Sequence, residues 1–265
     1  MGTAVGIVIP AYQPDVDRLT SYVEALTESV DPAVIRIELD EPTDGVLAAL
    51  ETLPVTVNAV ANRRGKGAAI TSGFEQLDTD VLAFVDADGS TPPASVSAVI
   101  EPIVDGTAAL SVGSRRHPDA DVRSHQTRAR RRLGDAFAWL ARRALDVRLY
   151  DYQCGAKAIS AEAWNDVRDH LVTPGFAWDI ELIAIAGALD VDVAEVPIVW
   201  EDRPESTVSP VATMIELGAT LVSVRHRAKC IAGNRLHRFV AARRGRRPSL
   251  VETLDVNAID ESAGG

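Results

Sequence analysis

The sequence predicts an α/β protein with a mainly parallel sheet and helices on both faces. With 265 residues, 46% of them hydrophobic, the chain can form one large α/β domain with a sizeable core. Short runs rich in β-branched residues alternate with segments whose apolar residues recur at helical spacing, a pattern typical of parallel sheets. The expected strands are residues 5–10, 34–39, 55–60, 81–85 and 108–112, and the expected helices are 17–29, 44–52, 67–77 and 94–104.

The regular alternation ends after residue 113, and C-terminal helices are expected beyond it. The expected elements are an Arg-rich loop and long helix over 124–146, a strand over 153–159, a helix over 179–188, a strand over 191–200 and a helix over 210–230. The tail from residue 243 is first basic, then acidic and rich in small residues. We therefore expect a domain over 1–210, an amphipathic and basic helical region over 211–247, and a disordered acidic tail over 248–265.

Acidic residues outnumber basic ones by 38 to 27, so the formal net charge is −11. Only three of the basic residues are lysines: Lys66, Lys157 and Lys229. An acidic surface that keeps arginine but has little lysine suggests a halophilic protein, because charges are strongly screened in high salt. The alternative is an ordinary acidic cytosolic protein. In either case the charge argues against a nucleic-acid partner.

Cysteine use and hydropathy indicate the compartment. Cys154 and Cys230 suggest neither a disulfide framework nor a metal site, which fits a reducing compartment. The first ten residues run into a strand without the basic start of a signal peptide. No apolar stretch reaches the roughly 20 residues that span a bilayer. We expect a soluble or peripheral protein.

Two carboxylates, Asp86 and Asp88, follow a short apolar run. Residues 81–85 are all apolar, as in a strand buried on both faces, and Gly89 to Pro93 end it. The acids therefore lie at the carboxyl end of the strand, where open α/β sheets bind their ligands. Two hard oxygen donors at this spacing suit a divalent cation that also holds a diphosphate. The alternative is a solvated turn.

Two further loops point to a phosphate-containing ligand. The first strand ends in Pro10, Ala11 and Tyr12, which places an aromatic ring where a nucleotide base could rest. Read as structure alone, it is a strand-to-helix turn capped by Asp15 or Asp17. Residues 62–67, Asn-Arg-Arg-Gly-Lys-Gly, open a helix, and a helix N-terminus with a lysine attracts phosphate. The spacing does not match a Walker A loop.

Taken in order, several motifs resemble one enzyme family. They are VIPAY, NRRGKGAAITSGF, VDADGST, the VGSR of residues 112–115, DYQCGAKAIS at 151–160, FAWDIEL at 176–182 and VDVAEVPIVW at 191–200. Over residues 5–210 the chain resembles the inverting glycosyltransferases of the GT-A fold, which is Rossmann-like. It is most similar to the branch that makes polyprenyl-phosphate sugars. DADGST and QCGAK look most like the dolichyl-phosphate glucose synthases, rather than the mannose synthases.

The resemblance implies roles for individual residues. Ser90 stands where many mannose-type relatives have a glutamine metal ligand, so the third ligand stays open. Arg115, Arg128 and Arg203 are candidates for the acceptor phosphate, since guanidinium groups bind phosphate bidentately. By the same resemblance, the nucleotide pocket would be lined by Pro10, Ala11, Tyr12 and Asp15, the base would contact Asp40, and Lys66 would lie near the nucleotide. Asp86 and Asp88 would bind Mg²⁺ or Mn²⁺ on the donor diphosphate. Gln153 and Asp179 would face the sugar or the acceptor.

Two segments depart from the pattern of the family. Relatives often carry Asp-Asp-Gly-Ser after the second strand, whereas this chain has Asp-Glu-Pro-Thr-Asp-Gly at 40–45, so the contact to the base is open to change. Many relatives also carry Gly-x-Ser-Lys after the last strand. Here residues 203–208 contain no lysine, and Arg203 would have to supply that charge.

The implied reaction is metal-dependent, inverting transfer of a hexose from a UDP-glucose or GDP-mannose type donor to polyprenyl (dolichyl) phosphate, feeding glycan assembly such as protein N-glycosylation. A phosphate acceptor with a second pKa of about 6 is largely dianionic at neutral pH and needs no strong general base. The main alternative is a transferase of the same fold that glycosylates a glycan or lipid-linked glycan, with Asp179 as base. A nucleotidylyltransferase and a non-catalytic sugar-nucleotide sensor are further alternatives.

Basic segments suggest contact with a membrane surface. Over residues 128–145, Leu133, Phe137 and Leu140 fall on one helical stripe with arginines at both ends, which suits a helix lying in a bilayer interface. The alternative is a helix that packs this stripe into the core. A second basic zone over 225–247 would attract anionic lipid head groups. The expected location is the cytoplasmic face of the cell membrane, with peripheral attachment.

Overall fold

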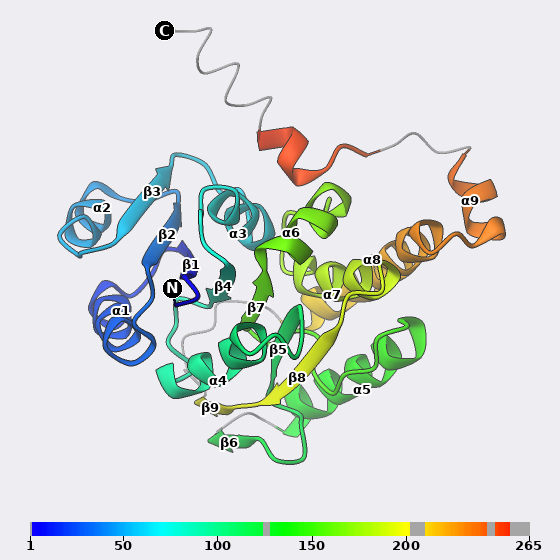
Figure 1. Ribbon diagram of the computed structural model, residues 1–265, viewed down its shortest axis with the longest axis horizontal. Helices are drawn as coiled ribbons and strands as arrows, with labels where there is room; N and C mark the ends of the chain where they lie inside the picture. Colours follow the sequence, from blue (N-terminus) through cyan, green and yellow to red (C-terminus); the bar gives the residue numbers. More distant parts are fainter. Residues whose placement is uncertain (1, 124–127, 202–209, 243–246, 255–265) are drawn as a thin grey trace, which may run out of the picture.

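A seven-stranded sheet forms the centre of the computed structural model, which describes residues 2–123, 128–201, 210–242 and 247–254 (Figure 1). The strand order is β3-β2-β1-β4-β7-β5-β8, and a separate two-stranded ribbon pairs β6 with β9. Every pair in the large sheet is parallel except those that β7 makes with β4 and β5, so the prediction of a mainly parallel sheet is confirmed. The strands are β1 (Val5–Tyr12), β2 (Val34–Asp40), β3 (Thr56–Val60), β4 (Val81–Val85), β5 (Leu110–Ser114), β6 (Asp121–Arg123), β7 (Ala156–Ser160), β8 (Val193–Pro197) and β9 (Val199–Glu201).

Helices cover both faces of the sheet, and each face has its own core. One core packs α1, α2 and α4 against the sheet, and the other packs α3, α5, α6, α7 and α8. This two-sided burial explains why the central strands are almost entirely apolar. The helices are α1 (Val16–Val30), α2 (Asp44–Leu50), α3 (Lys66–Phe74), α4 (Pro93–Val104), α5 (Arg128–Ala144), α6 (Ala161–Val167), α7 (Trp178–Ala188), α8 (Pro210–Ile231) and α9 (Arg235–Ala241), with a 3₁₀ turn η1 (Arg168–His170) after α6.

The antiparallel strand β7 brings a later part of the chain to the end of β4. Val85, the last residue of β4, pairs with Ala156, the first residue of β7. The backbone N–H of Asp86 continues this ladder by donating to the carbonyl of Gly155, 2.9 Å away. The segment before β7 therefore lies beside the acids that follow β4.

The structure differs from the sequence-based expectation in two segments of the second half. The helical stripe proposed for a bilayer is wrong at Phe137, which is only 4% exposed and packs in the core beside Ala141. Leu140 is 44% exposed, and the side chain of Leu133 lies outside the described residues. Helix α5 packs against α8 and buries this face in the core, so only its other face can meet solvent or lipid.

The second difference lies in the C-terminal segment. Residues 250–254 are helical, Ser249 is buried, and the N–H of Leu250 donates to the carbonyl of Leu171 at 2.8 Å. The expectation of disorder from residue 248 therefore does not hold for 249–254, while 255–265 lie outside the described residues. Within the described part of the chain, no helix is both long and apolar enough to cross a bilayer.

Candidate active site

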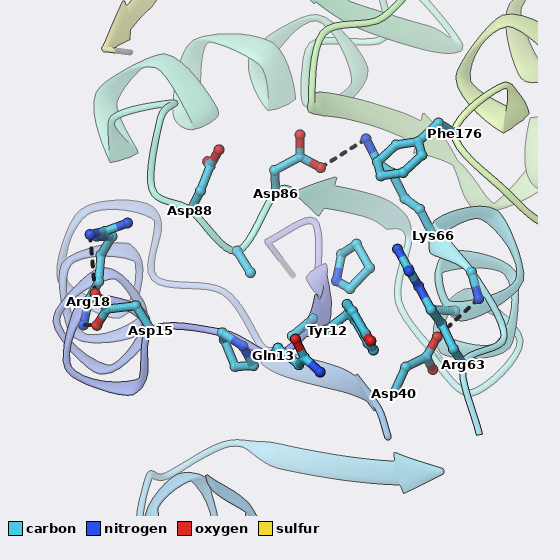
Figure 2. Close-up of a pocket in the computed structure, with 16 residues that line it drawn as sticks. Tyr12, Gln13, Asp15, Arg18, Asp40, Arg63, Lys66, Asp86, Asp88 and Phe176 are labelled. Carbon is cyan, nitrogen blue, oxygen red and sulfur yellow. Dashed lines mark hydrogen bonds and ion pairs between the residues drawn. The ribbon is translucent and has the colours of Figure 1, made fainter. Parts of the chain in front are cut away.

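A pocket of about 390 Å³ opens at the carboxyl ends of β1, β2 and β4 (Figure 2). Parallel strands end at the same edge of a sheet, so residues far apart in the sequence meet there. The loop before α7 adds Phe176, which is 44% exposed. The lining residues are Pro10, Ala11, Tyr12, Gln13, Pro14, Asp15, Arg18, Asp40, Arg63, Gly65, Lys66, Ala69, Asp86, Ala87, Asp88 and Phe176.

The first wall comes from the turn between β1 and α1. Gln13 has a φ of 47°, and the turn ends at Asp15, the N-cap of α1. The carboxylate of Asp15 accepts from the N–H of Arg18 at 3.0 Å and pairs with its guanidinium at 3.1 Å. Asp15 therefore caps the helix while facing the pocket, so the structural interpretation of this turn is confirmed.

Asp40, at the end of β2, holds the Gly-Lys loop in place. Its carboxylate is buried and accepts from the N–H groups of Arg64 and Gly65, at 2.8 and 3.0 Å, and from Arg64 Nε at 2.7 Å. Gly65 has a φ of 97°, and a Cβ there would meet the carbonyl oxygen of Pro174 at 2.7 Å. Only glycine suits this close approach. Asp40, which we predicted to contact a base, therefore holds the Gly-Lys loop in place in this structure.

Arg63 is a pocket residue that sequence reasoning missed. Its guanidinium carbon lies 4.0 Å from the centre of the Tyr12 ring, and both residues line the pocket (Figure 2). Such stacking combines a flat aromatic surface with a positive charge. The sequence had shown Arg63 only as part of the NRRGKG stretch, without indicating which of its two arginines faces the ligand.

Asp86 and Asp88 project from the loop after β4 into the pocket (Figure 2). The side chain of Asp86 is 41% exposed, and its Oδ1 lies 2.8 Å from Lys66 Nζ. Burial raises the pKa of Asp86, and the negative charges of Asp88 and Asp179 add to the rise, while Lys66 opposes it. A cation at this site would relieve the repulsion between the acids.

Ser90, which stands at the position of the third metal ligand in many mannose-type relatives, does not line the pocket. It is 4% exposed, and its N–H donates to Asp88 Oδ1 at 2.9 Å, which fixes the turn. In the described part of the chain, no three His, Cys, Asp or Glu side chains are grouped to hold a metal ion. Of the predicted ligands, the two carboxylates of Asp86 and Asp88 line the pocket, and such a pair would suit a hard divalent cation whose other ligands are phosphate oxygens and water.

Lys66 begins α3 and joins the acids of the pocket to a buried ion pair. Its Nζ lies 3.1 Å from Asp179 Oδ2, and Asp179 Oδ1 lies 2.6 Å from Lys157 Nζ. Burial alone would lower the pKa of Lys66, but Asp179 and Asp86 outweigh it and raise the pKa. Burial would likewise raise the pKa of Asp179, but Lys157 and Lys66 lower it. Asp179 is 2% exposed and does not line the pocket.

Arg115, at the end of β5, is held by an internal partner. Its Nε and Nη2 donate to the two carboxylate oxygens of Asp151 at 2.7 and 3.1 Å, and burial of Asp151 is nearly complete. Gln153 follows, and its N–H donates to Asp151 Oδ1 at 3.0 Å. Arg115 and Gln153 are not among the residues that line the pocket.

The two remaining arginine candidates cannot be placed at the site. Arg128 begins α5, but its side chain lies outside the described residues, as does the whole of Arg203. Sequence reasoning also missed Phe176, an exposed phenyl ring beside Lys66 in the pocket (Figure 2). It missed the pairing of Lys157 with Asp179 as well. The QCGAK motif gave a signal for Lys157, but its partner is 22 residues away.

Close packing explains why glycine stands at two positions, one in QCGAK and one in the Gly-Lys loop. A Cβ on Gly155 would lie 1.9 Å from Asp86 Oδ2, and a Cβ on Gly67 would lie 2.5 Å from Cβ of Trp178. The glycine of QCGAK therefore leaves room for Asp86, and the second glycine of the Gly-Lys loop leaves room for α7.

Comparison with known proteins identifies the family and the fold. Residues 6–163, more than half of the chain, match Glycosyl transferase family 2. The chain is 28% identical over 231 residues to glycosyltransferase AglD of Haloferax volcanii, which covers 83% of this chain and 37% of that protein. It is 28% identical over 178 residues to the dolichyl-phosphate beta-glucosyltransferase of Mus musculus, which covers 65% of this chain and 55% of that protein. The chain thus spans less than two thirds of these relatives.

Another relative is covered more fully. The undecaprenyl-phosphate mannosyltransferase of Micrococcus luteus is 26% identical over 205 residues, which cover 74% of this chain and 83% of that protein. Among solved structures, glucosyl-3-phosphoglycerate synthase from Mycobacterium tuberculosis, in complex with Mn²⁺, UDP-glucose and phosphoglyceric acid, superimposes with a TM-score of 0.62 at 19% identity. The match covers 88% of this chain and 80% of that one. It shows the GT-A-like fold, and the sequence match over residues 6–163 shows that this chain is a glycosyltransferase belonging to glycosyl transferase family 2.

Proposed function

We propose that the protein transfers a hexose from a nucleotide sugar to polyprenyl (dolichyl-type) phosphate with inversion, using Mg²⁺ or Mn²⁺. The observation that carries this proposal is the pocket wall on which Asp86, Asp88 and Lys66 face one another. Two carboxylates and an ammonium group suit a metal-bound diphosphate, which is the leaving part of a nucleotide sugar.

The donor would lie along the strand ends. The Tyr12 ring with Arg63 over it offers a surface for the base, and Asp40 and Asp15 also line the pocket. The diphosphate would then reach the acids after β4. In the solved relative from Mycobacterium tuberculosis, the bound donor is UDP-glucose.

The metal would be held by Asp86 and Asp88, with the diphosphate supplying further oxygen ligands. When bound, a divalent cation neutralises the negative charge that develops on the leaving diphosphate. Lys66 places a second positive charge at the same wall, where its Nζ lies 2.8 Å from Asp86 Oδ1. The chain's own task is to orient the diphosphate so that the sugar carbon is open to attack in line.

The acceptor is proposed from what the named relatives share. One is a dolichyl-phosphate beta-glucosyltransferase and another an undecaprenyl-phosphate mannosyltransferase, so their sugars differ while both names specify a polyprenyl phosphate. The site supports an acceptor that is already an anion. Asp179 is ion-paired on both carboxylate oxygens and its pKa is lowered, so it is a weak general base. A phosphate acceptor does not need one.

One experiment tests donor and acceptor together. Purified protein would be incubated with polyprenyl phosphate, Mn²⁺ or Mg²⁺ and a panel of UDP- and GDP-sugars. We expect a lipid product whose mass equals polyprenyl phosphate plus one hexose, together with release of one nucleoside diphosphate. Transfer to a glycan or lipid-linked glycan, with polyprenyl phosphate left unchanged, would overturn the proposal and favour the alternative acceptor.

We also propose that the C-terminal helices bring the enzyme to the cytoplasmic face of the membrane. Residues 217–251 contain nine Arg and Lys and no Asp or Glu, in a chain of net charge −11. On α9, Leu236, Phe239 and Val240 are 70%, 58% and 39% exposed, and their i, i+3, i+4 spacing forms one stripe. An exposed apolar stripe with basic neighbours suits an anionic bilayer surface.

Vesicle flotation tests this attachment. Wild type should float with vesicles that contain anionic phosphatidylglycerol, and a Leu236→Gln, Phe239→Gln variant should lose most of that binding. Val104→Gln is a matched control, because Val104 is 43% exposed on α4. Absence of vesicle binding by wild type at any ionic strength would contradict the attachment, without bearing on the reaction.

A further inference from the structure

Four charged side chains form a row that runs from the pocket into the core. Asp86 pairs with Lys66 at 2.8 Å, Lys66 with Asp179 at 3.1 Å, and Asp179 with Lys157 at 2.6 Å. The exposed fraction of the side chains falls along the row, from 41% at Asp86 to 11%, 3% and 1%. Two of the three lysines of the chain are in this row.

Lys157 is the buried end of the row. Its Nζ donates to Asp179 Oδ1 and, at 2.7 Å, to the carbonyl of Cys154, and the residue is not among those that line the pocket. A buried lysine is costly to desolvate and is normally retained only where it is paired. Because Lys157 is so buried, it can affect a ligand in the pocket only through its neighbours.

The charge balance within the row affects Lys66, the lysine that lines the pocket. Asp179 is shared between Lys157 on Oδ1 and Lys66 on Oδ2, and Lys66 is in turn shared between Asp179 and Asp86. If Lys157 lost its charge, Lys66 would be the sole lysine left in the row to balance buried Asp179. Attraction between opposite charges is stronger in the interior than at the surface, so Lys66 would be drawn inward.

We infer that Lys157 is a positioning residue for the donor site: by neutralising one oxygen of Asp179, it leaves the Lys66 ammonium free to serve the pocket. The inference rests on the proposed function, in which Lys66 meets a diphosphate. Asp179 transmits the effect, because it stands between the two lysines and touches both.

Equilibrium binding of UDP and of GDP, each with Mn²⁺, measures this effect without requiring turnover. We expect Lys157→Met to weaken the binding of whichever nucleotide binds wild type by about tenfold, the loss expected when one charge contact is displaced. In turnover, the KM for the donor should rise while the KM for the acceptor stays within twofold. A structural role alone would instead lower the fraction of folded enzyme and leave both KM values unchanged. Lys229→Met is the control for the nucleotide-binding measurement alone, because Lys229 pairs with Asp146 and does not line the pocket.

A second variant separates the two roles even if Lys157→Met folds poorly. Lys157→Met combined with Asp179→Asn removes both buried charges, and Lys66 then keeps Asp86 as its partner in the row. We expect this double variant to bind the nucleotide at least fivefold more tightly than Lys157→Met, or within threefold of wild type if the single variant cannot be purified. Equal affinity of wild type and folded Lys157→Met, or a folded double variant at least tenfold weaker than wild type, would overturn the inference. Absence of nucleotide binding by wild type would overturn the proposed function instead.

Discussion

The two halves of the chain use their charged residues differently. Before residue 105, strand ends direct Tyr12, Asp40, Asp86 and Asp88 into one pocket. After it, the two charged residues of the predicted site whose side chains the structure describes are both ion-paired: Arg115 with Asp151, and Asp179 with two lysines. The first half therefore supplies every pocket-lining residue except Phe176, and the second half supplies the support behind them.

This support consists of close packing and charge balance across the two halves. Gly155 leaves room for Asp86, the carbonyl of Pro174 lies against Gly65, and Asp179 holds Lys66. The binding wall keeps its shape because a later segment of the chain fills the space behind each residue. Variants on the two sides should therefore fail in different ways.

The largest effect is expected in the first half, at Asp88. Asp88→Ala removes one of two carboxylates proposed to hold the metal, and we expect transfer to fall by about 10³-fold, as when one electrostatic contact to the developing charge is lost. The thermal unfolding midpoint should stay close to that of wild type, because Asp88 lies on a loop beside the pocket. Initial rates and thermal melts measure the two quantities.

A matched control for this variant is Asp78→Ala, since Asp78 is an exposed aspartate that does not line the pocket. It should retain activity within twofold. Near-normal transfer by Asp88→Ala would contradict a metal site in the first half. It would also contradict the division of roles between the two halves.

The next effect tests the support from the second half. In Gly155→Ala, the new Cβ would meet Asp86 Oδ2 at 1.9 Å, so Asp86 must move. We expect activity to fall about 10²-fold, the effect of misplacing a reacting group by about 1 Å. Steady-state kinetics measure the loss. Gly45→Ala is the control, because nothing lies within 4 Å of a Cβ there, and it should leave activity unchanged. Equal activity of both variants would show that QCGAK does not support Asp86.

A stability effect is expected at Arg115. Arg115→Ala leaves Asp151, which is 1% exposed, without the guanidinium that binds both of its oxygens. We expect the free energy of unfolding to fall by about 3 kcal/mol, as for a broken buried ion pair. Urea unfolding measures it. The double variant Arg115→Met, Asp151→Asn should recover most of the loss.

The same double variant separates support from acceptor binding. If Arg115 acts only by packing against Asp151, the double variant should also recover activity. If it keeps its stability but shows a raised KM for polyprenyl phosphate, Arg115 contacts the acceptor and the second half takes a direct part in the reaction.

A smaller effect concerns pH. Burial would raise the pKa of Asp151, but Arg115 outweighs it and holds the pKa well below its usual value. A carboxyl whose pKa is lower when folded adds stability above its unfolded pKa of about 3.9, and this stability is lost as the pH falls below that value. Between pH 5 and pH 3, wild type should therefore lose about 1 kcal/mol more than Asp151→Asn. Urea unfolding at the two pH values measures both losses, and an equal loss of unfolding free energy in the two proteins would contradict this prediction.

The smallest effect is expected at Arg63. Arg63→Gln removes the positive charge that lies over the Tyr12 ring, and we expect nucleotide affinity to fall about threefold, in line with an exposed cation–π contact. Calorimetry of nucleotide binding measures it. Arg123→Gln is the control, since Arg123 is 61% exposed on β6 and does not line the pocket. A loss in both variants would indicate a general effect of charge.

The predictions from sequence were most accurate where local pattern and position suffice. The apolar run of residues 81–85 is β4, and the acids after it line the pocket. Asp15 caps α1 as one interpretation of its turn required. In each case the cause is local, since five apolar residues form a buried strand wherever they are covered on both faces. Amphipathic pattern failed at Phe137, because the pattern defines a stripe on a helix without telling which neighbour covers it.

The sequence by itself determined the alternating α/β architecture, the position of Asp86 and Asp88 at a strand end, and the motifs that mark the family. Only the tertiary structure decided that Lys66 joins Asp86 to Asp179, that Lys157 lies behind them, and that Arg115 pairs with Asp151. The physical reason is the separation along the chain between the residues that interact. Strand and helix patterns arise from neighbours along the chain, whereas ion pairs between residues up to 113 positions apart depend on which elements the sheet brings together.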